Sequence, residues 1–351
     1  MSVSPCSLPE LGWTDHYERQ LIAEDRERAV PARIVSTHRG HIVAFTGQEE
    51  HLLLIAEKGL MSFGEQPTVG DWVLLDRETL LPVRLLERGT VFKRMASGTE
   101  VRVQPIAANV DTLFIVTSCN RDFNLNRIER YLCLALEAEV EPVVVITKAD
   151  LCGDPDRYRR EAESLMNGLA VRVINAKDKE GVEILRDWFE VGKTVAMLGS
   201  SGVGKTTILN TIHGEDLSRS GEVRFGDDRG RHTTTTRSLH RLAGGALLVD
   251  MPGIRELQLH DSEDGLSRVF SDVEEAVALC RFSDCRHDRE PGCAVREAVE
   301  SGAMSQRHVE NYFKLLQELE ESEENLRKRR NREHRVVRNV KAAKRGKSRR
   351  R

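Results

Sequence analysis

The residues with the clearest chemistry form a glycine-rich loop that follows an apolar run. The loop has the pattern G-x-x-x-x-G-K-[ST], between the apolar residues 195–198 and a helix-like run at 206–212. Amides of such a loop, together with the N-terminus of the next helix, hold phosphate groups. Lys205 is predicted to bridge the β- and γ-phosphates and the Thr206 hydroxyl to bind magnesium. The flanking strand and helix argue against a chance glycine-rich turn. The predicted phosphate contacts are Gly199, Ser200, Ser201, Gly202, Val203, Gly204, Lys205, Thr206 and Thr207.

A second group of residues supplies the magnesium side of this site. Asp250 ends the apolar run 246–249, where a carboxylate reaches magnesium, usually through water, and Gly253 can offer its amide to the γ-phosphate. The polar stretch 226–236 is expected to become ordered around the γ-phosphate, with Thr234 as the favoured magnesium ligand. Ile254 stands where many hydrolases of this type carry the glutamine that orients the attacking water. His232 is the nearest candidate for that role, and a merely exposed histidine is the alternative.

The residues after another apolar run predict that the bound base is guanine. Thr147, Lys148, Ala149 and Asp150 come after residues 143–146, which indicate a central parallel strand. The Asp150 carboxylate can accept two hydrogen bonds from guanine, which adenine cannot supply, and the Lys148 stem can lie along the base. A second base loop, Asn175, Ala176 and Lys177, follows the apolar run 171–174. Both loops depart from the common pattern, which has Asn at the position of Thr147 and Ser at that of Asn175.

The motifs occur in an unusual order along the chain. The guanine motif comes about fifty residues before the phosphate loop, whereas an ordinary GTPase has the phosphate loop first. The sequence therefore predicts a circularly permuted site. Helical composition at 125–138, 155–168 and 181–190 alternates with strands, starting from a strand at 112–116. This alternation predicts an α/β fold with a parallel sheet covered by helices on both faces.

Four metal-ligating residues lie close together further along the chain. Cys280, Cys285, His287 and Cys293 offer three thiolates and one imidazole within fourteen residues. Such a closed Cys₃His set suits one structural, tetrahedral zinc per chain, with unrelated buried thiols as the alternative. The other four cysteines, Cys6, Cys119, Cys133 and Cys152, are expected to be ordinary small apolar residues. Seven cysteines with no signal peptide and no long apolar span favour a reduced cytoplasm and no membrane partner. The chain is expected to act as a monomer.

The two ends of the chain differ from this centre. Residues 31–105 contain short β-like runs at 32–35, 41–45, 51–55 and 72–75, punctuated by glycines, which predicts a small β-barrel. Residues 327–351 contain fourteen Lys and Arg against the single acid Glu333, although the whole chain has a net charge of −3. A solvated tail is the simplest explanation of this basic block. A block of this density nonetheless suggests a polyanionic partner, most plausibly RNA.

These motifs together resemble one known family, the circularly permuted, small-subunit-dependent ribosomal GTPases called RsgA or YjeQ. The resemblance covers about residues 30–320. It rests on the permuted order, the Arg231-His232-Thr233-Thr234-Thr235 segment, Ile254, and Asp284-Cys285-Arg286-His287 followed by Glu290-Pro291-Gly292-Cys293. It implies an OB-like barrel at 31–105 after an extension at 1–30, a GTPase domain at 106–262, a helical zinc-binding domain at 263–322 and a basic tail at 323–351.

The function implied by the resemblance is hydrolysis of GTP to GDP and phosphate, with magnesium, stimulated by the small ribosomal subunit during its late maturation. The rRNA of that subunit is the expected polyanion. One alternative is a nucleotide-switched, RNA-binding assembly protein with negligible turnover, which Ile254 favours. A more distant alternative is an ATP-using P-loop kinase, and Asp150 argues against it.

Overall fold

Two compact units make up the computed structural model of this 351-residue chain. It describes residues 5–38, 40–54, 64–95, 103–213, 237–242, 244–250, 262–322 and 324. The first unit comprises Met1–Lys93 and Pro105–Leu257, and the second comprises Arg94–Gln104 and Gln258–Arg351. Within the described residues, no helix is long and apolar enough to cross a membrane.

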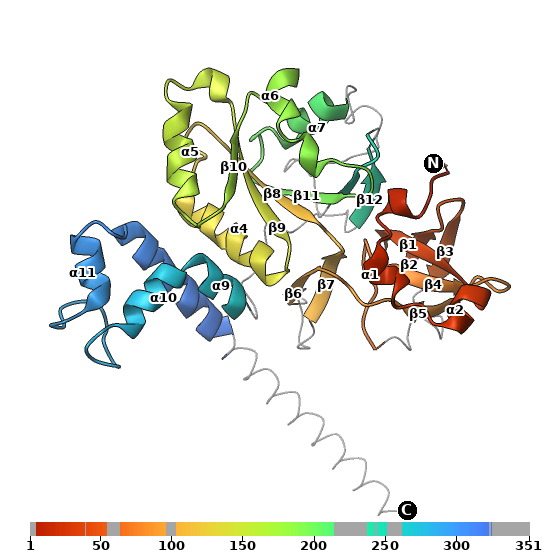
Figure 1. Ribbon diagram of the computed structural model, residues 1–351, viewed down its shortest axis with the longest axis horizontal. Coiled ribbons are helices and arrows are strands. Elements are labelled where there is room, and N and C mark those ends of the chain that lie inside the picture. Colours follow the sequence, from red (N-terminus) through yellow and green to blue (C-terminus); the bar gives the residue numbers. More distant parts are fainter. Residues whose placement is uncertain are drawn as a thin grey trace, which may run out of the picture. The chain divides into compact units, whose positions relative to one another are not determined.

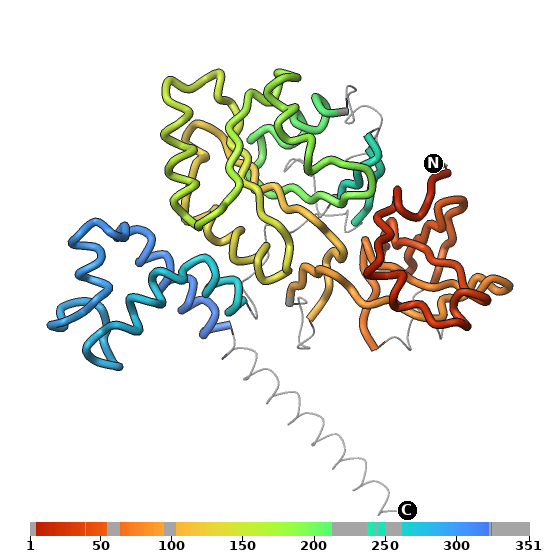
Figure 2. The backbone as a smooth tube through the Cα atoms, viewed as in Figure 1, coloured from red at the N-terminus to blue at the C-terminus, as the bar shows by residue number. Residues whose placement is uncertain are grey.

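Six strands of the first unit carry the predicted nucleotide motifs. Their spatial order is β10 (Ala170–Val173), β9 (Glu141–Thr147), β8 (Thr112–Ser118), β11 (Thr194–Leu198), β13 (Leu247–Asp250) and β12 (Arg237–Arg241). The first five are parallel and β12 is antiparallel, so the sheet is mixed where a parallel one was expected. Of these six strands, the three that precede the phosphate loop in sequence, β8, β9 and β10, lie on one side of β11, and the two that follow it, β12 and β13, lie on the other (Figure 1 and Figure 2). The permuted order is thus visible in the sheet.

Helices cover both faces of these strands. Alternate side chains of a strand point to opposite faces, and here the side chains on both faces are apolar and buried. One face packs against α6 (Lys179–Glu183) and α7 (Lys205–His213). Its core includes Phe114, Val116, Val143, Val145, Met197, Ile208 and Leu209. The intervening residues Leu113, Ile115 and Val144 are equally buried. They turn to the face where α4 (Leu125–Glu137) and α5 (Pro155–Glu163) contact β8, β9 and β10 (Figure 1).

Two of these helices, α4 and α5, begin at side-chain caps. Asn124 accepts a hydrogen bond from the Arg127 amide at 3.0 Å before α4, and Asp154 accepts one from Arg157 at 3.1 Å before α5. The run predicted to be helical to 168 ends earlier, at Glu163. The run 181–190 is divided between α6 and a 3₁₀ turn, Arg186–Trp188.

The N-terminal strands extend the same sheet. They are β1 (Ala29–Thr37), β2 (His41–Phe45), β3 (Glu50–Leu54), β4 (Trp72–Asp76) and β5 (Pro82–Leu85), paired antiparallel in the order β5-β4-β1-β2-β3. β1 starts before the expected boundary at residue 31. It also pairs with β12, with Ser36 opposite Ser238 and Thr37 opposite Arg237. β6 (Val91–Met95) and β7 (Val103–Ala108) form a separate two-stranded sheet.

A short N-terminal segment packs on these strands. η1 (Pro9–Leu11), α1 (Asp15–Glu18) and α2 (Ala23–Arg28) precede β1. Trp13 meets the buried Trp72 edge-on, with ring centroids 4.8 Å apart, and Tyr17 lies beside both rings. This aromatic cluster, with Leu11 and Phe45, forms the core between the segment and the strands.

The C-terminal part of the second unit is helical in its described residues, 262–322 and 324. It contains α9 (Glu263–Val269), α10 (Ser271–Ala278), α11 (Ala294–Glu300) and a helix over residues 306–322. Phe270 is fully buried and stacks on His308 at 4.6 Å. His308 also lies 3.2 Å from the carboxylate of Asp272, so this contact ties the start of α10 to the last described helix.

Candidate nucleotide site and metal centre

The phosphate loop joins β11 to α7 at the carboxyl edge of the sheet. Gly199 has φ of +152°, and a Cβ added to it would lie 2.1 Å from the Val116 carbonyl of β8, so no other residue fits there. Gly202 and Gly204 have φ of +75° and +107°. The Lys205 ammonium donates to the carbonyls of Gly199 at 2.9 Å and Ser200 at 2.8 Å. The lysine therefore lies folded over the loop whose amides are expected to hold phosphate.

The predicted guanine loop lies beside this phosphate loop. Thr147 is fully buried at the end of β9, and its hydroxyl donates to the Val203 carbonyl at 2.5 Å while lying 3.1 Å from that of Thr117. Gly204 also packs against it, since an added Cβ would lie 3.4 Å from the Thr147 hydroxyl. A threonine in place of the usual asparagine thus still ties the two loops together. Residues about fifty positions apart in sequence meet at one edge.

The residues after Thr147 turn sharply toward solvent. Lys148 has φ of +61°, in the left-handed region, and Ala149 to Leu151 form a 3₁₀ turn. The Ala149 amide donates to the carbonyl of Ile174 at 3.2 Å, which joins this turn to the end of the next strand. Asp150 is exposed, so its carboxylate is available to a base.

The second base loop is organised by its own side chain. The Asn175 side-chain oxygen accepts a hydrogen bond from the Lys177 amide at 3.1 Å, an Asx turn that a serine makes more weakly. Thr211 of α7 donates to the Ala176 carbonyl at 2.7 Å. The helix that follows the phosphate loop therefore also holds the base loop. Thr211 was not among the predicted site residues, because nothing in its local sequence signals this contact.

Among the residues predicted for the magnesium side, the structure describes only the backbone of Asp250. Asp250 ends β13 opposite Ser238 of β12, at the same edge as the phosphate loop. The predicted residues His232, Thr234, Gly253 and Ile254 lie outside the described residues. Their roles remain predictions.

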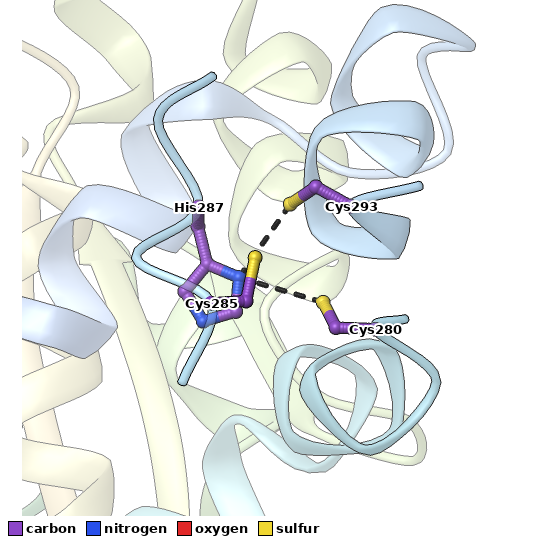
Figure 3. A group of neighbouring side chains, drawn as sticks. All are labelled: Cys280, Cys285, His287 and Cys293. Carbon is purple, nitrogen blue, oxygen red and sulfur yellow. Dashed lines mark hydrogen bonds between the residues drawn. The ribbon is translucent and has the colours of Figure 1, made fainter. Parts of the chain in front are cut away.

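The four predicted zinc ligands come together in the second unit (Figure 3). Their ligand atoms all lie within 4.8 Å of one another, and His287 Nδ1 is 3.5 Å from the sulfurs of both Cys280 and Cys293. A tetrahedral zinc, with Zn–S of about 2.3 Å and Zn–N of about 2.0 Å, places sulfur and nitrogen about 3.5 Å apart. The cluster therefore fits zinc in both ligand type and spacing.

Neighbouring residues hold the segments that contain these four ligands. Cys293 caps α11, with its sulfur 3.5 Å from the Arg296 amide. The Glu290 carboxylate accepts bonds from the amides of Arg286, Asp288 and Arg289, at 3.0 to 3.1 Å, and backbone hydrogen bonds lower its pKa to about 2. This acid holds the loop around His287, whose ring stacks on Phe313. Glu290 was not among the predicted site residues, although its position in the sequence between His287 and Cys293 could have indicated this role.

The fold and this sheet edge define a class of protein, the P-loop GTPases with circularly permuted strand order. The family model described as RsgA GTPase matches residues 85–260, about half of the chain. The chain belongs to the RsgA GTPase family. A model described as a 50S ribosome-binding GTPase matches residues 194–329, and that match begins at the first residue of β11, where the phosphate-loop strand starts.

Similar proteins cover most of the chain. A protein of Vibrio vulnificus (strain CMCP6) named "Small ribosomal subunit biogenesis GTPase RsgA 2" is 46% identical, covering 90% of this chain and 89% of its own. One of Mesorhizobium japonicum named "Small ribosomal subunit biogenesis GTPase RsgA" is 42% identical over 91% of each. Among solved structures, YjeQ from Thermotoga maritima is 30% identical with a TM-score of 0.59, covering 83% of this chain and 98% of its own. YloQ, titled a circularly permuted GTPase, is 22% identical with a TM-score of 0.55 over 86% and 99%, and shows the fold alone.

Proposed function

We propose that this GTPase binds GTP and magnesium at the edge formed by β9, β10, β11 and β13, and uses hydrolysis in late maturation of the small ribosomal subunit. The main observation in support of this nucleotide site is the hydrogen bond from the Thr147 hydroxyl to the Val203 carbonyl. It places the guanine loop against the phosphate loop although their order in sequence is reversed. The names of the relatives carry the ribosomal part of the proposal.

In this proposal Asp150 selects guanine, with Lys148 along the base and the loop 175–177 on its other side. Lys205 leaves the two carbonyls it now contacts and bridges the β- and γ-phosphates. Thr206, Thr234 and Asp250 hold magnesium, which neutralises charge on the phosphates when bound. Gly253 donates its amide to the γ-phosphate, and His232 is the candidate that orients water.

The other parts of the chain fit the same role. The Cys₃His cluster holds one structural zinc, and a closed set leaves no position for a reactive water. The N-terminal strands form the OB-like barrel, and the basic tail contacts rRNA phosphates. The protein acts in the cytoplasm as a monomer, with domains at 31–105, 106–262 and 263–322 between an N-terminal extension and the tail.

The two matched families differ in the subunit that they name. The relatives that match nine-tenths of the chain are named for the small subunit, whereas the 50S description belongs to a model of residues 194–329 alone. The decisive experiment is GTP turnover by purified protein titrated with small subunits and, separately, with large subunits. We expect acceleration by small subunits only, with Lys205→Ala as the inactive control. Acceleration by large subunits alone would contradict the assignment to the small subunit.

A nucleotide-switched binding protein with negligible turnover is the second candidate, because Ile254 occupies the usual glutamine position. The same titration distinguishes the two. The switch protein would bind small subunits in its GTP state with no increase in phosphate release at any subunit concentration.

A further inference from the structure

One threonine outside the predicted motifs ties the phosphate-loop helix to the second base loop. Thr211 is half-buried on α7, six residues after Lys205. Its hydroxyl donates to the Ala176 carbonyl at 2.7 Å, the usual length of such a bond. A helix rises about 1.5 Å per residue, so this bond is made about 9 Å along α7 from the lysine that is expected to hold the phosphates. A single helix therefore connects the phosphate end of the proposed site to its base end.

The bonds around Thr211 fix the direction of one peptide group in the base loop. The Thr211 hydroxyl holds the carbonyl of the peptide group between Ala176 and Lys177. The amide of the same group donates to the Asn175 side-chain oxygen at 3.1 Å. A peptide group is planar, so bonds at both of its ends fix its plane. The preceding peptide group is held by the Asp178 amide, which donates to the Asn175 carbonyl at 3.0 Å.

This arrangement leaves the Ala176 amide as a donor for a ligand. Ala176 is 6% exposed and belongs to the same core cluster as Ile208 and Leu209 of α7. Its amide donates to no acceptor in the described part of the chain. Backbone amides of buried residues are nearly always paired, so a ligand is the partner to look for. An N–H donor suits the O6 acceptor of guanine and not the N6 amino group of adenine, which is itself a donor.

Hydrogen bonds join the three loops of the proposed site in a closed series. The Thr147 hydroxyl joins the guanine loop to the phosphate loop at the Val203 carbonyl. The Ala149 amide joins the guanine loop to the second base loop at the Ile174 carbonyl. Thr211 completes the series, because α7 continues directly from the phosphate loop. Removing its hydroxyl opens the series and leaves apolar packing between α7 and the second base loop.

We propose that Thr211 is a positioning residue for base selection, which holds the loop 175–177 so that the Ala176 amide donates to the O6 atom of guanine. This rests on the proposed function, because it needs a guanine nucleotide between the two base loops. Thr211 contacts neither the base nor the phosphates and acts through the Ala176 carbonyl. Its loss lowers selectivity for the O6 atom and leaves the contact of Asp150 with the 2-amino group unchanged.

The test measures the affinity of full-length protein for three nucleotides by competition with a fluorescent GDP analogue. 6-Thio-GDP has sulfur, a weaker acceptor, in place of O6, and IDP lacks the 2-amino group that Asp150 is proposed to bind. Thr211→Val keeps the shape of the side chain without its hydroxyl, and should bind GDP roughly three- to tenfold more weakly. Its preference for GDP over 6-thio-GDP should fall, while its preference for GDP over IDP should not change.

Three further variants separate positioning from stability. Thr211→Ser keeps the hydroxyl and should keep both preferences. Thr211→Ala removes the hydroxyl with a residue of higher helix propensity, and the proposal requires the same result from it as from Thr211→Val. Thr90→Val is the matched control, because the half-buried Thr90 hydroxyl also donates to a backbone carbonyl, that of Val110 at 2.8 Å. This control should keep all three affinities, and urea unfolding measures the stability of every variant.

Equal weakening of all three nucleotides by Thr211→Val would give Thr211 a general structural role and overturn the proposal. Unchanged GDP affinity would overturn it as well, and so would an unaltered protein that binds 6-thio-GDP as tightly as GDP. If the unaltered protein binds GDP no more tightly than ADP, the proposed function itself fails. That comparison is made before any variant, so the two failures are distinguished.

Discussion

Arg33 offers the sharpest test of how the N-terminal strands are held to the nucleotide half of the sheet. Its side chain is fully buried, on β1. It donates to the carbonyls of Leu11, Gly70 and Asn109, the last two at 3.3 and 3.0 Å, and to the Thr194 hydroxyl at 2.9 Å. Thr194 begins the phosphate-loop strand β11, so one guanidinium joins the N-terminal segment, β1 and β11.

Replacing Arg33 by Met keeps an apolar stem and removes every donor. The Gly70 carbonyl keeps a bond from the Asn109 side chain at 2.9 Å, whereas the Thr194 hydroxyl oxygen loses the Arg33 donor. The buried carbonyls of Leu11 and Asn109 lose their donor, at about 1–3 kcal/mol each. The guanidinium no longer has to be desolvated, which offsets part of this loss. We expect the free energy of unfolding to fall by about 3 kcal/mol.

Urea unfolding followed by tryptophan fluorescence measures this change, because Trp72 lies 5.7 Å from the Arg33 guanidinium and Trp13 packs on Trp72. Arg33→Lys should lie between the two, since an ammonium keeps the charge but reaches fewer acceptors. Arg28→Met is the matched control, because its exposed ion pair with Glu24 should contribute less than about 0.5 kcal/mol. A loss below about 1 kcal/mol for Arg33→Met would refute the proposed role of these bonds.

Three further predictions concern the proposed sites. Asp150→Asn should lower GTP affinity and improve binding of xanthosine triphosphate, measured by competition with a fluorescent nucleotide; an unchanged preference would refute the role of Asp150. Elemental analysis should find one zinc per chain, and Cys285→Ser should unfold the helical unit at lower urea while GDP affinity is kept; metal-free protein purified without chelator would contradict the zinc site. Deleting residues 327–351 should weaken binding to small subunits and flatten its salt dependence by roughly 0.7–0.9 log units per lost phosphate contact, with intrinsic turnover unchanged. An intact salt slope would mean that the tail has another partner.

Local sequence was sufficient for the elements whose chemistry is local. The phosphate loop needs Gly199 where β8 approaches and Lys205 at the start of a helix, and both requirements leave a recognisable spacing. The zinc ligands lie within fourteen residues, so their convergence depends on one loop and two helix ends. The permuted order was also readable, because each motif follows its own apolar strand and the carboxyl ends of parallel strands share one edge.

Contacts between distant segments could not be predicted in this way. The Arg33 bonds to Leu11 and Thr194 and the ladder between β1 and β12 depend on which strands are neighbours. An apolar run shows that a strand is buried but not which strand lies beside it. Strands pair through backbone N–H and C=O groups, which are the same in every strand. Packing of the whole sheet chooses the partner. The sequence by itself therefore determined the motifs and their chemistry, and the tertiary structure decided which side chains outside those motifs support them.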